Sequence, residues 1–236
     1  RMRTAPVLRK AFIPIKFTSK FICYIVKGLT CISIKIIKEF INPRKKIKDM
    51  TLRRALVVLT EGAEEMELVI TVDVLRRAGI DTTIAGLYTE DLIKCSRNVV
   101  IKPDINLTFI RPDDYDAIIL PGGAKAASTF SQDQTVGYLL KEFESKNKVI
   151  AVICASPIAL EKHNVAIGRR VTSHPSVAEK LNKRFKYSEE RVVNDNGLIT
   201  SRGPGSAFEF ALEIIRHLIG DFKVKEVEPS MMLPTN

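Results

Sequence analysis

Short apolar runs and amphipathic stretches alternate along the chain from residue 54 onward. The apolar runs are rich in β-branched residues, which is typical of buried strands, whereas the amphipathic stretches have helical spacing. Strands are predicted at residues 54–59, 81–86, 98–101, 115–120, 149–153 and 198–200, and helices at residues 64–77, 135–145, 176–184 and 206–219. This alternation predicts an α/β domain with a mostly parallel sheet and helices on both of its faces.

The apolar run at residues 149–153 leads directly into Cys154, and Pro157 follows three residues later. Because proline suits the first turn of a helix, this order predicts a sharp turn from strand to helix at the cysteine. Such a turn points the thiol at the free N–H groups of the new helix, which favour a thiolate. The sequence therefore predicts a reactive, low-pKa thiolate at Cys154; the alternative is a buried, inert cysteine.

Three acidic residues open the first predicted helix. Acids in a first helical turn commonly only complement the helix dipole, and this interpretation is preferred for Glu64 and Glu65. Glu67 differs because Ile70 and Val74, three and seven positions on, place it at the margin of the buried face. We therefore expect the Glu67 carboxyl to be partly desolvated and held protonated.

A glycine pair, Gly122 and Gly123, ends another predicted strand. Two glycines there let backbone N–H groups approach a ligand closely, although a plain turn has the same sequence. Ligands of parallel α/β sheets bind at the carboxyl ends of the strands, so Gly123 and Cys154 are predicted at one edge of the sheet. His174 also follows an extended segment and is a candidate for that edge, with a structural role as the alternative. The remaining histidines are interpreted as ordinary helix residues: His163 and His217.

The net charge of +10 is unevenly distributed along the chain. Residues 1–48 contain thirteen Lys or Arg and one acidic residue, whereas residues 49–236 contain 24 basic and 26 acidic residues. The body therefore lacks the basic surface typical of nucleic-acid binding, and no such partner is expected. Neither a disulfide framework nor a zinc site is expected, because no paired spacing links the four cysteines, Cys23, Cys31, Cys95 and Cys154.

The basic segment at residues 1–49 has three interpretations. It is amphipathic and poor in acids, which is typical of an organelle transit peptide. It is alternatively a disordered arm, or translated upstream sequence, because Met50 stands directly before the first strand. No charge-free run in it approaches the length of a membrane span. We expect residues 50–236 to form one domain in the cytoplasm, with the mitochondrion and the nucleus as further locations.

The motifs taken together resemble one family, the ThiJ/PfpI superfamily and, within it, the DJ-one branch, over about residues 53–236. The motifs that carry the resemblance stand in one order: Gly62-Ala-Glu-Glu-Met-Glu67, Cys95-Ser-Arg97, Leu120-Pro-Gly-Gly123, Ile153-Cys-Ala155, His174-Pro175 and Ser201-Arg-Gly-Pro-Gly205. Two positions depart from the family pattern. Ser156 stands where glycine is familiar, and Lys102 replaces a peripheral cysteine of some animal relatives.

The resemblance implies a flavodoxin-like three-layer sandwich and a homodimer that meets through the face carrying the first helix. It also implies that Cys154 pairs with a protonated Glu67. Further roles follow from it residue by residue: oxyanion donors at the backbone of Gly123 and Ala155, a nearby histidine at His174, and arginines on the dimer-side approach at Arg97 and Arg202.

Two functions are implied, and both use the same pair of residues. In the first, Cys154 and Glu67 act without metal or organic cofactor as a glutathione-independent glyoxalase or deglycase on small 2-oxoaldehydes, such as methylglyoxal, or on their adducts, with a role in the oxidative stress response. In the second, Cys154 is oxidised to a sulfinate, and the protein is a redox sensor with chaperone-like behaviour. A cysteine peptidase is a weaker alternative, because His174 has no acidic partner nearby in the sequence.

Overall fold

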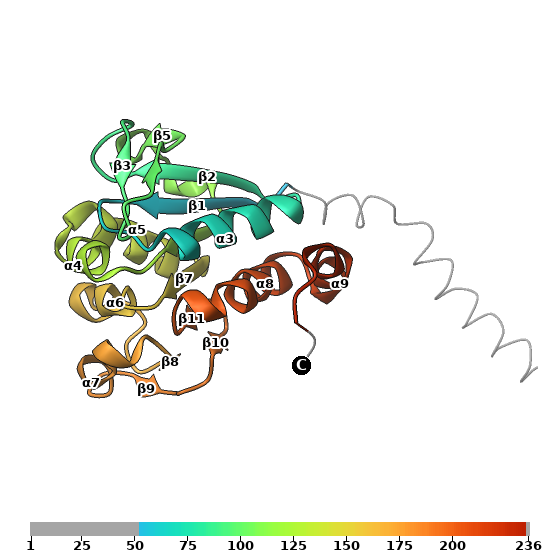
Figure 1. Cartoon of the computed structure of the whole chain (residues 1–236). Helices are drawn as coiled ribbons and strands as arrows, with labels where there is room; N and C mark the ends of the chain where they lie inside the picture. The colour runs from blue at the N-terminus through green and yellow to red at the C-terminus, as the bar shows by residue number, and fades with distance from the viewer. Residues whose placement is uncertain (1–51, 235–236) are drawn as a thin grey trace, which may run out of the picture. The chain divides into compact units, whose positions relative to one another are not determined.

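A seven-stranded sheet forms the centre of the computed structural model, which describes residues 52–234 (Figure 1). The predicted arm at residues 1–49 lies outside the described residues. In spatial order the strands are β10 (Val192–Asp195), β11 (Leu198–Ser201), β7 (Val149–Ile153), β6 (Ala117–Leu120), β1 (Arg54–Leu59), β2 (Asp81–Gly86) and β5 (Ile105–Asn106). All neighbouring pairs are parallel except β10 with β11, which form an antiparallel hairpin.

The five strands β2-β1-β6-β7-β11 follow the strand order of flavodoxin. In this order the connections leave β1 in opposite directions, so the loops that follow β1 and β6 open a crevice at the carboxyl edge of the sheet. The predicted flavodoxin-like fold is confirmed. Cys154 and Gly123 follow β7 and β6 at this same edge, as the sequence predicted.

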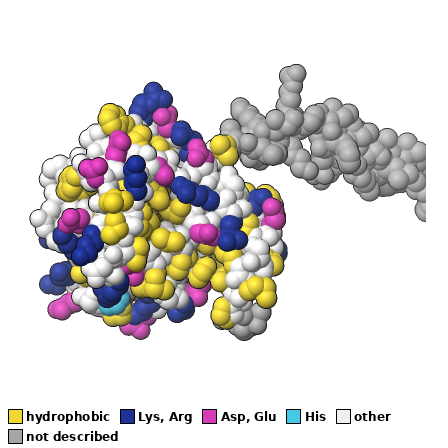
Figure 2. All heavy atoms as spheres, turned by 45° about the horizontal axis from the view of Figure 1, so that its top comes forward, with side chains coloured by type: hydrophobic (Ala, Val, Ile, Leu, Met, Phe, Trp, Pro, Cys, Tyr) yellow, Lys and Arg dark blue, Asp and Glu magenta, His cyan; other side chains and the backbone are white. Residues whose placement is uncertain are grey.

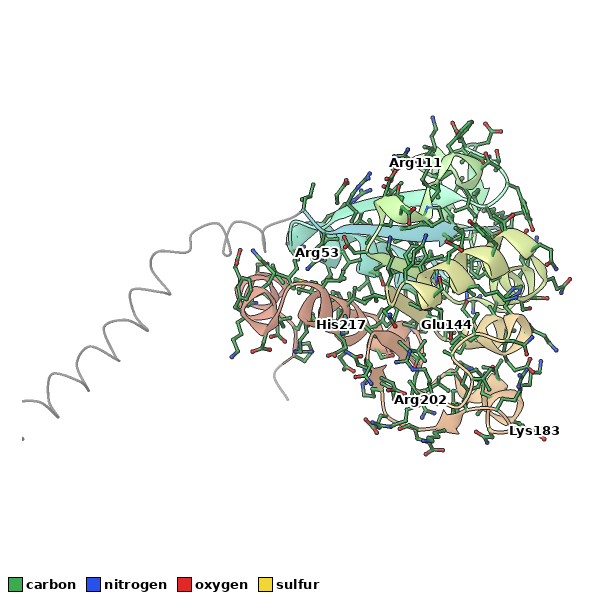
Figure 3. All side chains as sticks on the ribbon, turned by 180° about the vertical axis from the view of Figure 1, so that it is seen from behind. Arg53, Arg111, Glu144, Lys183, Arg202 and His217 are labelled. Carbon is green, nitrogen blue, oxygen red and sulfur yellow. The ribbon has the colours of Figure 1, made fainter. Side chains whose placement is uncertain are left out.

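Helices cover both faces of the sheet. On one face lie α3 (Glu65–Arg77) and α8 (Ala207–Leu218), with α9 (Asp221–Val227) beside α8 (Figure 1). On the other lie α4 (Ala124–Gln132), α5 (Gln134–Ser145) and α6 (Pro157–His163); the view from behind brings α5, with Glu144 labelled, to the front (Figure 3). Because both faces are covered, the central strands β1, β6 and β7 are almost wholly apolar and buried. Each of their large side chains contributes about 1.5–3 kcal/mol by burial.

Smaller elements surround this core. The remaining strands are β3 (Ile93–Lys94) and β4 (Val100–Ile101), which form an antiparallel hairpin, and β8 (Arg170–Val171) and β9 (Lys186–Tyr187), which pair in parallel. The remaining helices are α7 (Ala178–Leu181) and five 3-10 helices at Leu107–Phe109, Pro112–Asp114, Pro175–Val177, Pro204–Ser206 and Glu228–Met231. No helix within residues 52–234 is long and apolar enough to cross a membrane.

The structure differs from the sequence prediction at several helices: α4 and α9 were not predicted, and α7 covers only part of the helix predicted at residues 176–184. Helix α4 begins directly after the glycine pair, and Phe130 is the one large apolar side chain among its nine residues. The sequence Ser206-Ala-Phe-Glu209 is typical of a capping box, yet no side chain caps the N-terminus of α8. The Ser206 hydroxyl instead accepts from the Gly203 N–H at 3.2 Å, and Glu209 pairs with Arg191 at 2.9 Å. Ser206 thus bonds within the preceding 3-10 turn, and Glu209 bonds to a residue 18 positions earlier in the chain.

Candidate active site

The chain turns sharply at Cys154, between β7 and α6. Its φ of 64° is a left-handed conformation that is rare for a residue with a side chain. The Cys154 N–H donates to the Ser201 carbonyl at 2.9 Å, and its own carbonyl accepts from the His174 N–H at 2.7 Å. Both backbone groups of the strained residue are therefore fixed by neighbouring segments. The predicted turn from strand to helix is confirmed.

Glu67 lies on α3 beside this thiol, and its side chain is fully buried. Its Oε2 accepts from the Gly122 N–H at 2.6 Å, whereas Oε1 has no hydrogen-bond partner among the described residues. Gly122 separates the two side chains. A Cβ on it would lie 2.4 Å from the Cys154 Cβ and 2.6 Å from Glu67 Oε2, so only glycine lets both approach the same peptide.

The environment of Glu67 favours its neutral form. Burial raises the pKa of Glu67 to about 7, and the charge of Glu64 adds to this, while hydrogen bonds with Gly122 and Cys154 oppose it. The direction agrees with the sequence prediction, which placed Glu67 at the margin of the buried face. The burial is more complete than predicted, because the loop after β6 closes over the carboxyl.

The thiol departs from the sequence prediction. Burial raises the pKa of Cys154 to about 12, and the charge of Glu67 adds to this, while the N–H groups of Gly123 and Ala155 lower it only in part. This direction differs from the low-pKa thiolate that the local turn predicts, because the loss of hydration on burial opposes the dipole of the short helix α6. Cys154 and Glu67 thus hold one proton between them over a wide pH range, and a thiolate forms when Glu67 takes that proton.

The two predicted oxyanion donors lie at this thiol. The backbone N–H groups of Gly123 and Ala155 both bond to Cys154, and each lowers its pKa. Gly123 has a φ of 96°, and a Cβ on it would lie 2.2 Å from the Gly62 carbonyl oxygen. Glycine is therefore required here both by the left-handed backbone and by the close approach of the loop after β1.

His174 stands at the rim of the site. Its imidazole is exposed, and Nδ1 accepts from the Ser176 N–H at 3.2 Å and lies 2.8 Å from the Ser176 hydroxyl. A Cβ on Gly203 would lie 3.7 Å from the His174 ring and 3.9 Å from Glu67 Oε1, so the ring and the free carboxyl oxygen face the same space. No carboxylate among the described residues is hydrogen-bonded to the ring.

The two predicted arginines do not hydrogen-bond to the Cys154 and Glu67 side chains. Arg97 is exposed in the turn between β3 and β4, where its guanidinium donates to the Ser96 carbonyl at 3.3 Å. The Arg202 guanidinium, labelled in Figure 3, donates to the Glu189 carbonyl at 2.8 Å. Neither guanidinium is hydrogen-bonded to Cys154 or Glu67.

Sequence reasoning missed the role of Glu65, which it interpreted only as a complement to the helix dipole. Glu65 is buried, and it accepts from the Ser96 hydroxyl and the Arg97 N–H, each at 2.7 Å. Burial raises the pKa of Glu65, but these hydrogen bonds outweigh it and the net direction is downward. Glu65 thus anchors the β3–β4 hairpin to α3. No local signal could reveal this contact, because its partners lie 31 and 32 positions away.

The other described cysteine, Cys95, lacks activating neighbours. Burial raises the pKa of Cys95 to about 11, and the charges of Glu65 and Glu64 add to this. Within residues 52–234, no group of three or more His, Cys, Asp or Glu side chains is placed to hold a metal ion.

Comparison with known proteins agrees with this geometry. A family model described as the DJ-1/PfpI family matches residues 53–217. The chain belongs to the DJ-1/PfpI family. Protein dj-1beta of Drosophila melanogaster is 46% identical over 185 residues, which cover 78% of this chain and 99% of that protein. Its crystal structure superposes with a TM-score of 0.76 and covers 78% of this chain and all of the fly chain.

Two further relatives of this DJ-1/PfpI chain bear on its chemistry. Glutathione-independent glyoxalase DJR-1.2 of Caenorhabditis elegans is 38% identical over 177 residues, covering 74% of this chain and 94% of that protein. A structure described as Toxoplasma gondii DJ-1, oxidized, is 29% identical with a TM-score of 0.72, covering 78% of this chain and 100% of that one.

The coupled pair of this DJ-1/PfpI site predicts a characteristic pH profile of thiol reactivity. Alkylation of Cys154 by iodoacetamide should rise with a midpoint near the pKa of about 7, because ionised Glu67 can then take the thiol proton. In Glu67→Gln the midpoint should move to higher pH, since no group accepts that proton. Peptide mass spectrometry measures modification at Cys154, and Asp73→Asn, an exposed acid on the same helix, is the control. An unchanged midpoint in Glu67→Gln would refute the coupling.

Glu67 also predicts a pH dependence of stability. Its pKa is raised from 4.5 to about 7 by folding, so the native state holds a proton that the unfolded chain releases. The stabilisation is present below about pH 4.5 and is lost as the pH rises through about 7, to a total of about 3 kcal/mol. Urea unfolding at pH 5 and pH 8 should show this loss in the wild type and a smaller one in Glu67→Gln. Equal losses in both would contradict the raised pKa.

Proposed function

We propose that this protein is a cysteine-dependent, glutathione-independent glyoxalase that converts 2-oxoaldehydes such as methylglyoxal into 2-hydroxy acids. The observation that carries the proposal is the buried pair of Cys154 and Glu67, which meet at the Gly122 peptide with the Gly123 and Ala155 N–H groups at the thiol. The name of the C. elegans relative supports the same class of activity.

The pair supplies every proton transfer that this reaction needs. Glu67 accepts the thiol proton while the Cys154 sulfur bonds to the aldehyde carbon, and the new oxyanion lies at the Gly123 and Ala155 N–H groups. The oxyanion then takes the proton from Glu67. The Glu67 carboxylate next removes the hydrogen of the former aldehyde carbon as a proton and returns it to the neighbouring ketone carbon. The hydroxyl proton on the former aldehyde carbon moves to the ketone oxygen, which leaves a thioester of the hydroxy acid. Water breaks the sulfur–carbon bond, releases the acid and restores the thiol.

Oε1 of Glu67 is suited to carry the moving proton. It is buried and has no hydrogen-bond partner among the described residues, whereas Oε2 is held by Gly122. A carboxyl with one fixed and one free oxygen can exchange a proton with a substrate without losing its orientation. Deglycase activity on aldehyde adducts would differ in its first step, because the Cys154 sulfur would displace the amine from the adduct carbon and the leaving amine would take the thiol proton through Glu67.

A redox sensor is the second candidate, and the free oxygen of Glu67 favours it as well. A protonated Oε1 beside the sulfur could donate a hydrogen bond to a sulfinate oxygen formed by peroxide. The description of the Toxoplasma relative as oxidized supports oxidation as a property of related proteins. A cysteine peptidase is not favoured, because the His174 ring bonds to Ser176 rather than to an orienting carboxylate.

Turnover of methylglyoxal by the full chain without glutathione tests the proposal. Lactate should form, and Cys154→Ser should lower kcat below detection because the covalent step is lost. Glu67→Gln should lower kcat by roughly 10²- to 10⁴-fold, the usual contribution of a positioned acid or base. Asp73→Asn is the control. A wild type that makes no lactate, yet oxidises readily at Cys154 to the sulfinate, would overturn the enzyme and favour the sensor.

The chain also carries an apolar surface that supports the proposed homodimer. Met66 and Val69 on α3 are about half exposed, and so are Val99 and Val100 at the adjoining hairpin. Glu65 ties this hairpin to α3, so the four side chains belong to one rigid surface. Hydrophobic side chains gather across the middle of the face that carries α3 and α8 (Figure 2). Exposed apolar patches of this kind commonly mark protein interfaces.

Charge placed in this surface should dissociate the dimer. Sedimentation at micromolar concentration should give twice the monomer mass for the wild type and the monomer mass for Val69→Asp, since an unpaired carboxylate cannot be buried at an interface. Tyr138→Asp is the matched control, because Tyr138 is equally exposed on α5 across the sheet. A monomeric wild type would rule out the proposed dimer.

A further inference from the structure

One buried hydroxyl links the two loops that build the site. Ser156, two residues after the cysteine, is fully buried, and its Oγ donates to the Pro121 carbonyl at 2.6 Å. Pro121 directly follows the β6 strand and lies 35 positions earlier in the chain than Ser156. A buried hydroxyl is costly unless it is hydrogen-bonded, and a short bond to a carbonyl offsets that cost.

The same peptide group is held at its other end by Glu67. The Pro121 carbonyl and the Gly122 N–H belong to one planar peptide unit, so the direction of one fixes the direction of the other. The carbonyl accepts from Ser156 at 2.6 Å, and the N–H donates to Glu67 Oε2 at 2.6 Å. The next N–H along the chain, that of Gly123, bonds to Cys154.

We propose that Ser156 is a positioning residue, whose hydroxyl orients the Pro121–Gly122 peptide so that its N–H stays on Glu67 and the following N–H stays on Cys154. The hydroxyl also polarises this peptide, because hydrogen bonds in a chain strengthen one another. Ser156 therefore acts on the protonation of the pair without touching substrate. Of the tests below, only the measurement of turnover rests on the proposed function.

The hydroxyl can be removed without disturbing the backbone. Ser156 has a φ of −67° and a ψ of −19°, an ordinary right-handed conformation that alanine and glycine also adopt. Thr82 offers a matched control at the opposite edge of the sheet. It is buried in β2, and its hydroxyl donates to the Ile80 carbonyl at 3.0 Å. Ser156→Ala and Thr82→Val each remove one buried hydroxyl-to-carbonyl bond and should lower Tm by roughly 2–10 °C.

Only Ser156→Ala should change the chemistry of the thiol. With the peptide released, the Gly122 N–H bond that favours ionised Glu67 weakens, so the midpoint of Cys154 alkylation by iodoacetamide should move to higher pH. In the full chain, kcat for methylglyoxal should fall about tenfold at pH 7 with little change in KM, since a misplaced donor weakens the transition state. Thr82→Val should leave the alkylation midpoint and kcat unchanged.

Alkylation separates this inference from the proposed function, because it needs no turnover. A Ser156→Ala midpoint equal to that of the wild type, or an equal shift in Thr82→Val, overturns the inference even where the enzyme is active. A shifted midpoint supports it even where no lactate forms. If Ser156→Ala does not fold, Ser156→Gly takes its place, since glycine is well tolerated at a helix N-cap.

Discussion

The burial of one carboxyl group beside one thiol is the constraint on which the rest of the site depends. Neither group is stable as an isolated ion away from water, so Cys154 and Glu67 share a proton. This arrangement requires a third partner for Glu67 Oε2, which the Gly122 N–H supplies, and it requires glycine there because any Cβ would collide with both side chains. The Cys154–Glu67 pair therefore determines which residue can stand at position 122 in the loop after β6.

The strained turn at Cys154 is the second consequence. A left-handed residue with a side chain costs about 1–3 kcal/mol, and it persists only where the surroundings fix it. Here the pairing of β7 with β11 brings the Ser201 carbonyl to the Cys154 N–H, and the segment leading to His174 satisfies the Cys154 carbonyl. The stability of the parallel sheet thus holds the thiol in a position that the local sequence alone would not maintain.

The fold was largely predictable because its central strands are continuous apolar runs and its ligand edge follows from strand order. The sequence could predict which residues form the site, but it could not predict the pKa of Cys154. The elbow at Cys154 favoured a thiolate on local grounds, whereas the pKa is governed by burial against Glu67, a contact between residues 87 positions apart in the sequence. Glu65, Ser156 and Glu209 are similar cases, since each has a hydrogen-bond partner that the fold brings near from a distant part of the sequence.

The accessibility of the thiol bears on the choice among substrates. Cys154 is 9% exposed, and the N–H groups of Gly123 and Ala155 already converge on its sulfur, so a reacting carbon must come within bonding distance in a narrow space. A small 2-oxoaldehyde meets this condition, because its aldehyde carbon carries only hydrogen and one neighbour. An adduct on a folded protein brings a bulkier carbon and a tether. For the proposed glyoxalase, the enclosed geometry therefore favours free aldehydes over protein adducts, and the thiol of Cys154 would take the place that glutathione holds in thiol-dependent aldehyde chemistry.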